Sequence, residues 1–267
     1  MQYTVDGVIV REVNVGDNDK LLTIITPESG RISVMAKGAR SSKSKTLAAT
    51  QLYTYGNFEI YEKGDYKWLR GASVQESFFD MRNTIEGLSL AAYLADIAYE
   101  LTGEGEDSSE MLRLTLNAFY AISKKIAPLS IIKGVYELRS AARGGFRPDL
   151  SGCRHFRGGE EENIYLDVMN GCVICSQCMQ KKAEKQKEFM TGSAYADENE
   201  EKSLLLPITP SVLAAMRYAM DAPLSRLLSF KLDGQSEIDM FSRAAEEYLL
   251  NHLERGFTSL EFYKCMI

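Results

Sequence analysis

The sequence predicts an α+β protein of several domains, with a small N-terminal β-barrel followed by a mainly helical part. Three observations support this prediction. Short segments rich in β-branched and aromatic residues extend to about Phe79, apolar residues recur with helical spacing from Asn83 onward, and four of the five cysteines lie between residues 153 and 178. A chain of 267 residues is long enough to bury more than one core.

Five segments in the first 80 residues have the composition of β-strands. Turn signals separate them at residues 16–19, 27–30 and 63–65. The segments are residues 8–10, 21–26, 32–36, 58–61 and 68–69. Five short antiparallel strands in this length favour an OB-fold barrel over residues 1–80, and an SH3-like barrel is the alternative.

The rest of the chain is expected to be mainly helical. Apolar stripes with helical spacing run through residues 88–101, 112–122 and 238–249, and we interpret them as core. Asn83 with Glu86, and Ser236 with Asp239, have capping-box spacing, while Thr209 precedes a proline. The predicted divisions are a helical domain in two parts, residues 81–150 and 181–267, around an insertion at residues 151–180.

The cysteines of the insertion have the spacing of metal ligands. A Cys-x-x-Cys turn brings two sulfurs to one side of a tetrahedral ion, and a second arm completes the site. The predicted zinc ligands are Cys153, Cys172, Cys175 and Cys178, with His155 as a competitor for one position. Unligated core cysteines and an iron–sulfur cluster are the alternatives. An all-thiolate zinc site is closed to water, so its role would be structural. Cys265 is expected to be a small buried side chain.

Composition and motifs exclude several classes of protein. With two histidines and none of the common catalytic motifs, we expect no enzyme, no catalytic residues and no small-molecule substrate. No apolar run is long enough to cross a membrane, and the first residues lack a secretory signal, which favours the cytoplasm. A net charge of −6 means that any binding to phosphates must be local.

One such local region lies in the predicted barrel. No acidic residue occurs between positions 29 and 58, where the cations are Arg31, Lys37, Arg40, Lys43 and Lys45. The segment KGARSSKSK, residues 37–45, has the composition of a flexible loop that contacts a phosphate backbone. Nearby aromatic residues that could stack on bases are Tyr53, Tyr55, Tyr66 and Trp68, although each could equally pack inside the barrel. A solvated loop without a ligand is the alternative reading.

The order of these features resembles the RecO family of bacterial DNA repair and recombination-mediator proteins. The resemblance is carried by GVIVREVNVGDNDKLLTIITPESGRISVMAKGAR at the start, by YELRSAARGGFRPDLSGC at 136–153, by GCVICSQC at 171–178, and by SRLLSFKL and LNHLERGFTSLEFY near the end. It covers most of the chain, and the second and third segments are the specific ones.

The resemblance implies an N-terminal OB-fold, a helical C-terminal domain and a zinc-binding insertion. It also implies binding to single- and double-stranded DNA, annealing of complementary strands, and loading of RecA with RecR and RecF onto DNA coated by single-stranded-DNA-binding protein, at the nucleoid in the cytoplasm. By similarity, Lys37, Arg40 and Lys43 would contact DNA.

The sequence departs from the family pattern at one expected zinc ligand. The family has two Cys-x-x-Cys arms, but the position three residues after Cys153 is Phe156. Cys172 stands where the family usually has glycine, and we expect it to replace the missing ligand. The alternative function, of a different class, is a zinc-ribbon scaffold for protein–protein contacts that does not bind DNA directly.

Overall fold

The computed structural model describes residues 1–153, 164–178, 180 and 204–267. The chain forms two compact units, which are described separately: residues 1–132 with 256–267, and residues 133–255. Residues 181–202, which are rich in Lys and Glu, lie outside the described residues. None of the described helices has the length and apolar character needed to cross a membrane.

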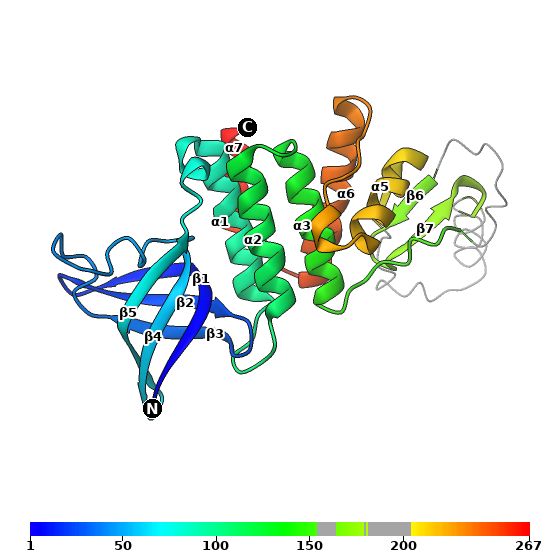
Figure 1. The fold of residues 1–267 in the computed structure, drawn as a ribbon. Helices are drawn as coiled ribbons and strands as arrows, with labels where there is room; N and C mark the ends of the chain where they lie inside the picture. The colour runs from blue at the N-terminus through cyan, green and yellow to red at the C-terminus, as the bar shows by residue number, and fades with distance from the viewer. Residues whose placement is uncertain (154–163, 179, 181–203) are drawn as a thin grey trace, which may run out of the picture. The chain divides into compact units, whose positions relative to one another are not determined.

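The first unit contains the predicted five-stranded closed barrel (Figure 1). Its strands are β1 (Gln2–Val15), β2 (Asp19–Thr26), β3 (Gly30–Ala36), β4 (Tyr55–Lys63) and β5 (Tyr66–Glu76). Their order around the barrel is β1-β2-β3-β5-β4, and β1 closes the barrel by pairing with β4. All the pairs are antiparallel except β3 with β5. This arrangement confirms the barrel prediction.

The first strand, β1, closes the barrel because it pairs with a different strand on each side. Residues 2–8 of β1 pair with β4, and residues 8–15 pair with β2, with a register shift between Ile9 and Arg11. At the crossing, a Cβ on Gly7 would lie 2.6 Å from both Ile24 Cγ2 and the Ile25 carbonyl oxygen. Only glycine therefore allows β1 to approach β2 this closely.

Alternate residues of the strands fill the barrel. The buried cluster is Ile9, Leu22, Ile24, Ile32, Val34, Ala36, Ala39, Phe58 and Ile60, with Tyr3, Val5, Leu52, Leu69 and Ala72 packed against it. The period of two in β2, β3 and β4 places their remaining side chains on the outside of the barrel.

Helices of the first unit pack beside the barrel. They are η1 (Phe79–Asn83), α1 (Ile85–Glu100), α2 (Ser109–Lys124) and, from the end of the chain, α7 (Thr258–Met266), which packs on α1. The predicted apolar stripes of α1 and α2 are largely buried. The helix cap is one residue later than predicted, because the Thr84 hydroxyl accepts the N–H of Gly87 while Asn83 ends η1.

The second unit combines helices with a small antiparallel sheet. Its helices are α3 (Leu129–Arg143, from Lys133), α5 (Pro210–Asp221), η2 (Leu224–Arg226) and α6 (Gln235–Leu253); its strands are β6 (Ile164–Asp167), β7 (Cys172–Cys175) and β8 (Leu205–Ile208). The strand order is β7-β6-β8. Thr209 caps α5 as predicted, whereas Ser236 lies inside the first turn of α6, whose cap position is Gly234.

A buried ion pair joins α3 to α6. The Lys133 ammonium lies 3.0 Å from Glu137 Oε1 and 2.7 Å from Glu246 Oε2, and the Lys133 and Glu137 side chains are 3% and 0% exposed. One ammonium thus contacts a fully buried carboxylate and a partly buried one. The group links the two helices at the cost of desolvating its charges.

Replacing Lys133 with methionine is expected to destabilise the second unit by about 3–5 kcal/mol, because the buried Glu137 carboxylate and the partly buried Glu246 carboxylate lose this counter-charge. Urea denaturation followed by circular dichroism measures the effect. The control is Lys124→Met, which removes the surface pair between Lys124 and Asp80 and should change the midpoint little. Equal shifts for the two variants would contradict the assignment.

Candidate nucleic-acid interface and metal centre

Residues 37–45, here called the basic loop, follow β3 and form a series of hydrogen-bonded turns. The N–H groups of Ser41 and Ser44 donate to the carbonyl oxygens of Gly38 and Ser41. Ala39 is completely buried and belongs to the barrel core. The sequence predicted a flexible loop. The buried Ala39 instead anchors the backbone between Lys37 and Arg40, while these charged residues stay at the surface.

The three lysines of the basic loop are exposed cations. Lys37, Lys43 and Lys45 are all classed as exposed, and within the described part of the chain none of them forms an ion pair. One carboxylate lies at the base of the loop, where Asp19 Oδ1 accepts the N–H of Gly38 at 2.7 Å. The loop therefore presents positive charge that pairs with no carboxylate among the residues that the structure describes.

Arg40 is exposed but held in place. Its guanidinium donates to the carbonyl oxygens of Gly16 and Asp17 at 3.3 and 3.0 Å, and its backbone N–H donates to the carbonyl oxygen of Asn18. These acceptors are neutral carbonyl oxygens, and through them Arg40 ties the basic loop to the β1–β2 turn.

Arg31 has a different environment from the other predicted cations. Its guanidinium lies 4.3 Å from the centre of the Tyr99 ring and donates to the Tyr99 carbonyl oxygen at 2.9 Å. The guanidinium of Arg11 lies 3.7 Å from the centre of the same ring and pairs with Asp96. The structure thus places Arg31 in the contact between the barrel and α1, apart from the basic loop.

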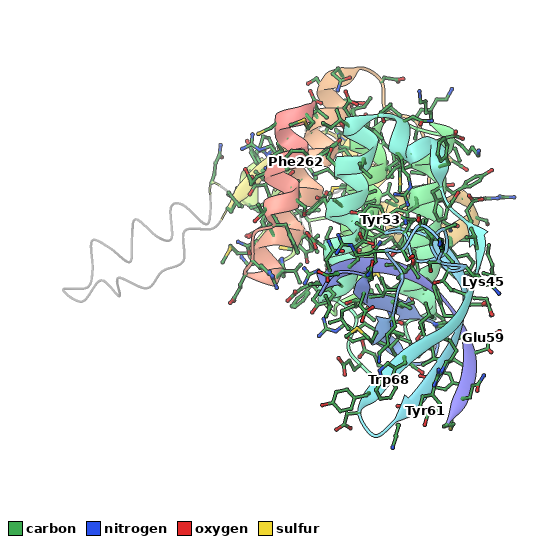
Figure 2. The ribbon with its side chains drawn as sticks, turned by 90° about the vertical axis from the view of Figure 1, so that its left-hand side faces the viewer. Lys45, Tyr53, Glu59, Tyr61, Trp68 and Phe262 are labelled. Atoms are coloured by element: carbon green, nitrogen blue, oxygen red, sulfur yellow. The ribbon has the colours of Figure 1, made fainter. Side chains whose placement is uncertain are left out.

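The four aromatic candidates separate into two groups. Tyr53 is 6% exposed and packs edge-on against Phe119. The pKa of Tyr53 is raised to about 12, mainly by burial. Tyr55 is half-buried. Tyr66 and Trp68 lie on the outside of the barrel. Tyr61, which the sequence pattern did not single out, lies there beside Trp68 (Figure 2). Tyr61 is directly opposite Trp68 in the pairing of β4 with β5, and a predicted pairing of these two strands would have identified it.

Three of the four predicted zinc ligands come together in the second unit. The sulfurs of Cys153, Cys175 and Cys178 all lie within 4.8 Å of one another, and those of Cys153 and Cys178 are 3.2 Å apart. Cys175 ends β7, and residues 176–178 form a helical turn that brings Cys178 back beside it. The cluster has the sulfur donors and the size to hold a metal ion.

The fourth predicted ligand, Cys172, is not part of this cluster. Cys172 and Cys175 are three positions apart in one β-strand, where successive side chains point to opposite faces. Cys172 instead lies near Tyr248 of α6. The pKa of Tyr248 is raised to about 12, first by burial and then by the charge of Cys172. The arrangement of the described residues therefore gives no support to Cys172 as the replacement for the missing family ligand, and that assignment stays a prediction.

The chemistry of the cysteine cluster fits a cation. The pKa of the Cys178 thiol is raised to about 12, first by its hydrogen bond with Cys153 and then by burial. The charges of the neighbouring sulfurs add to this rise, because they oppose a second negative charge. A bound cation would reverse this preference by stabilising the thiolates. His155 and Phe156 lie outside the described residues. Cys265, predicted to be buried, is exposed on α7.

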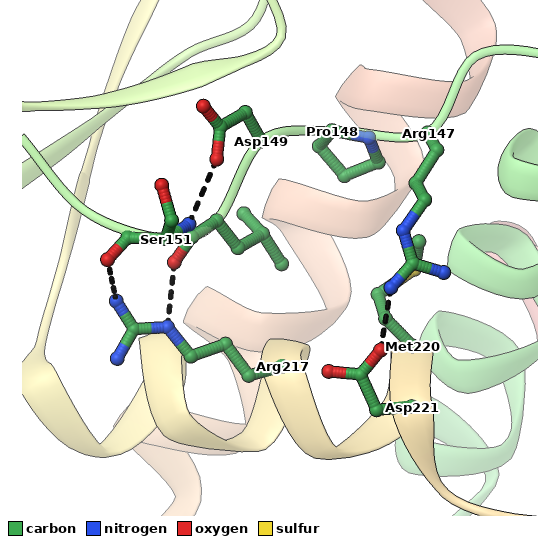
Figure 3. Close-up of a pocket in the computed structure, with 8 residues that line it drawn as sticks. Arg147, Pro148, Asp149, Ser151, Arg217, Met220 and Asp221 are labelled. Atoms are coloured by element: carbon green, nitrogen blue, oxygen red, sulfur yellow. Dashed lines mark hydrogen bonds and ion pairs between the residues drawn. The ribbon is translucent and has the colours of Figure 1, made fainter.

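A pocket of about 440 Å³ lies beside the arm that leads to Cys153 (Figure 3). Its polar groups bond to one another: Arg217 donates to the carbonyl oxygens of Leu150 and Ser151, and Arg147 pairs with Asp221 at 2.5 Å. These bonds attach residues 147–151 to α5. We therefore assign the pocket residues a positioning role for the first cysteine arm.

Comparison with known proteins agrees with this arrangement. Family models described as "Recombination protein O N terminal" and "Recombination protein O C terminal" match residues 1–78 and 82–193. A DNA repair protein RecO from Acetivibrio thermocellus is 31% identical over 261 residues, which cover 97% of this chain and 95% of that protein. RecO from Alkaliphilus metalliredigens is 23% identical over 99% of both chains. RecO from Bacillus velezensis is 30% identical over 66% of this chain and 68% of its own. The chain belongs to the RecO family of DNA repair proteins.

Proposed function

We propose that this protein is a recombination mediator that binds single- and double-stranded DNA through the basic loop of its barrel. The observation that carries the proposal is the set of three exposed lysines, Lys37, Lys43 and Lys45, which form no ion pair within the described residues. Family membership supports the same function. The proposal includes no enzymatic step, so binding and not bond cleavage is the activity to explain.

The charge distribution explains how an acidic chain can bind a polyanion. The net charge of −6 repels DNA at long range, but screening limits that repulsion to about 8–10 Å at physiological salt. At shorter range, the loop lysines displace condensed counterions from the phosphates, and Arg40 adds a fixed charge at the β1–β2 turn. These contacts carry no sequence information, as a protein that serves any damaged site requires.

The further activities follow from this binding. A cationic loop that contacts two strands lowers the repulsion between them, which favours annealing of complementary strands without ATP. We propose RecR as the main partner, with RecF and single-stranded-DNA-binding protein as further partners in RecA loading, in the cytoplasm at the nucleoid.

A protein–protein scaffold that does not touch DNA is the second candidate function. The cysteine cluster in the second unit favours it, because small metal-braced modules often serve as docking surfaces. The two functions differ in how binding depends on salt.

Replacing Lys43 and Lys45 together with alanine is expected to weaken binding to all DNA sequences alike. If each lysine neutralises one phosphate, the slope of log K against log salt for single strands should fall by about 1.4, since each contact contributes roughly 0.7. Fluorescence anisotropy between about 50 and 200 mM salt measures it. The matched control replaces Lys231 and Arg243, exposed cations of the second unit, with alanine. An unchanged slope in the Lys43/Lys45 variant, or no DNA binding at low salt, favours the scaffold.

The purified protein is expected to anneal complementary oligonucleotides in the absence of nucleotide. Annealing followed by fluorescence energy transfer should be faster with the protein than without it, and slower with the Lys43→Ala, Lys45→Ala variant than with the Lys231→Ala, Arg243→Ala control. Annealing at the spontaneous rate at several protein concentrations would contradict this activity.

For the cysteine cluster, we propose structural zinc held by Cys153, Cys175 and Cys178. Three thiolates supply three of the four ligands that structural zinc takes, and sulfur donors favour zinc over the hard cations calcium and magnesium. When bound, the ion would contribute folding energy to the second unit and no reaction.

Cys175→Ser is expected to remove the metal, whereas Cys172→Ser should leave it in place, because Cys172 points to the other face of β7. Elemental analysis should find about one equivalent of zinc in the native protein and in Cys172→Ser. Loss of zinc in Cys172→Ser would restore Cys172 as a ligand. Melting temperature should fall on chelation in the native protein but not in Cys175→Ser.

A further inference from the structure

Three aromatic side chains form a continuous row on the outside of the barrel. The ring centres of Tyr61 and Trp68 are 5.9 Å apart with planes at 32°, and those of Tyr66 and Trp68 are 5.9 Å apart with planes at 27°. Tyr66 is 71% exposed, so the outer part of the row is open to solvent. Figure 2 shows Tyr61 and Trp68 side by side near the β4–β5 turn.

The strand register explains why these rings are outside. Tyr61 is directly opposite Trp68 in the β4–β5 pair, while their neighbours Ile60 and Leu69 point into the barrel core. The barrel is therefore already filled without the three rings. Tyr66 is exposed and Tyr61 and Trp68 are half-buried, so the row leaves aromatic surface in water that a ligand could cover.

A β-bulge adds a cation to the row. The register between β4 and β5 shifts after Ile60–Leu69, so that Glu59 pairs with Gly71 and Arg70 is the extra residue. The Arg70 guanidinium lies 5.0 Å from the centre of the Tyr61 ring. Bulges commonly redirect a side chain in this way. We call Tyr61, Trp68, Tyr66 and Arg70 the aromatic platform.

The parallel pairing of β3 with β5 places the platform next to the basic loop. Met35 of β3 is the partner of Trp68, and the basic loop begins two residues later at Lys37. Met35 and Lys37 alternate with the buried Val34 and Ala36, so they belong to the outer face. The aromatic row and the start of the cation series are thus neighbours on one outer face of the barrel.

We propose that the aromatic platform binds the bases of single-stranded DNA by stacking, while the basic loop holds the phosphates of the same strand. The inference rests on the proposed DNA-binding function and names the form of DNA that this face prefers. Bases offer their faces to aromatic rings only when they are unpaired, so the platform selects single strands over duplex. Every base has such a face, so the selection is independent of sequence.

The charges around the platform are compatible with a nucleic acid. The carboxylate of Glu62 is paired with Lys67 at 3.2 Å, and Lys63 at the β4–β5 turn is exposed. Glu59 and Asp65 are also exposed nearby, so the local field is mixed. The platform therefore contributes through its rings and Arg70, and the basic loop contributes most of the charge.

The chain contains one tryptophan, Trp68, which makes the test direct. Titration of the full-length protein with oligothymidylate should quench the tryptophan fluorescence, because a base stacks on the row. An abasic oligonucleotide of the same length keeps the phosphates but lacks the bases. It should bind more weakly, as measured by anisotropy, and should leave the tryptophan emission nearly unchanged.

Substitution separates the platform from the loop. Tyr66→Ala should weaken oligothymidylate binding by about 5- to 100-fold and leave duplex binding nearly unchanged, while Tyr66→Phe should bind like the native protein. Tyr120→Ala is the matched control, since Tyr120 is an exposed tyrosine (48%) on α2. Circular dichroism and melting temperature verify that each variant folds.

The outcomes distinguish the two proposals. If the native protein binds oligothymidylate and abasic DNA equally, with no quenching, or if Tyr66→Ala binds like Tyr120→Ala, the platform is not a base-binding site, although the DNA-binding function stands. If no DNA form binds at low salt, the proposed function fails as well. Loss of binding to a partner protein by Tyr66→Ala, with intact DNA affinity, would assign the platform to protein contacts.

Discussion

Closure of the N-terminal barrel is the constraint on which the rest of the first unit depends. One strand of 14 residues, β1, hydrogen-bonds to β4 with its first half and to β2 with its second half, and it approaches β2 closely because Gly7 carries no side chain. Once the sheet is closed, each strand has one face in the core and one face outside. The outer residues of β3, β4 and β5 are then free to serve binding.

The same closure decides which cations can reach a ligand. Lys20 of β2 is a cation of the same barrel, but it is 6% exposed and pairs with Glu12 at 2.8 Å. Arg31 contacts Tyr99 of α1. The lysines of the basic loop differ because Ala39 anchors the backbone between them in the core, which holds the loop on the surface. A charge therefore acts according to its neighbours in space and not according to its place in a basic run.

The cysteines illustrate the same dependence on local geometry. Cys172, Cys175 and Cys178 have equal spacings in the sequence. The first interval lies along a strand, which sends the two side chains to opposite faces, whereas the second follows a strand end into a helical turn, which returns Cys178 to Cys175. The arm that carries Cys153 is fixed separately, by the bonds of Arg217 to Leu150 and Ser151.

The five-stranded barrel, the apolar faces of the helices and the Thr209 cap could be predicted from the sequence, because they depend on local periodicity and composition. The family could be predicted from the resemblance of specific segments. The separation of Cys172 from the sulfur cluster, the contact of Arg31 with Tyr99, and the row of Tyr61, Trp68 and Tyr66 could not be predicted in this way. Each of these depends on residues from different elements meeting in space. Such contacts depend on strand register and helix packing, which cannot be deduced from the local spacing of residues in the sequence.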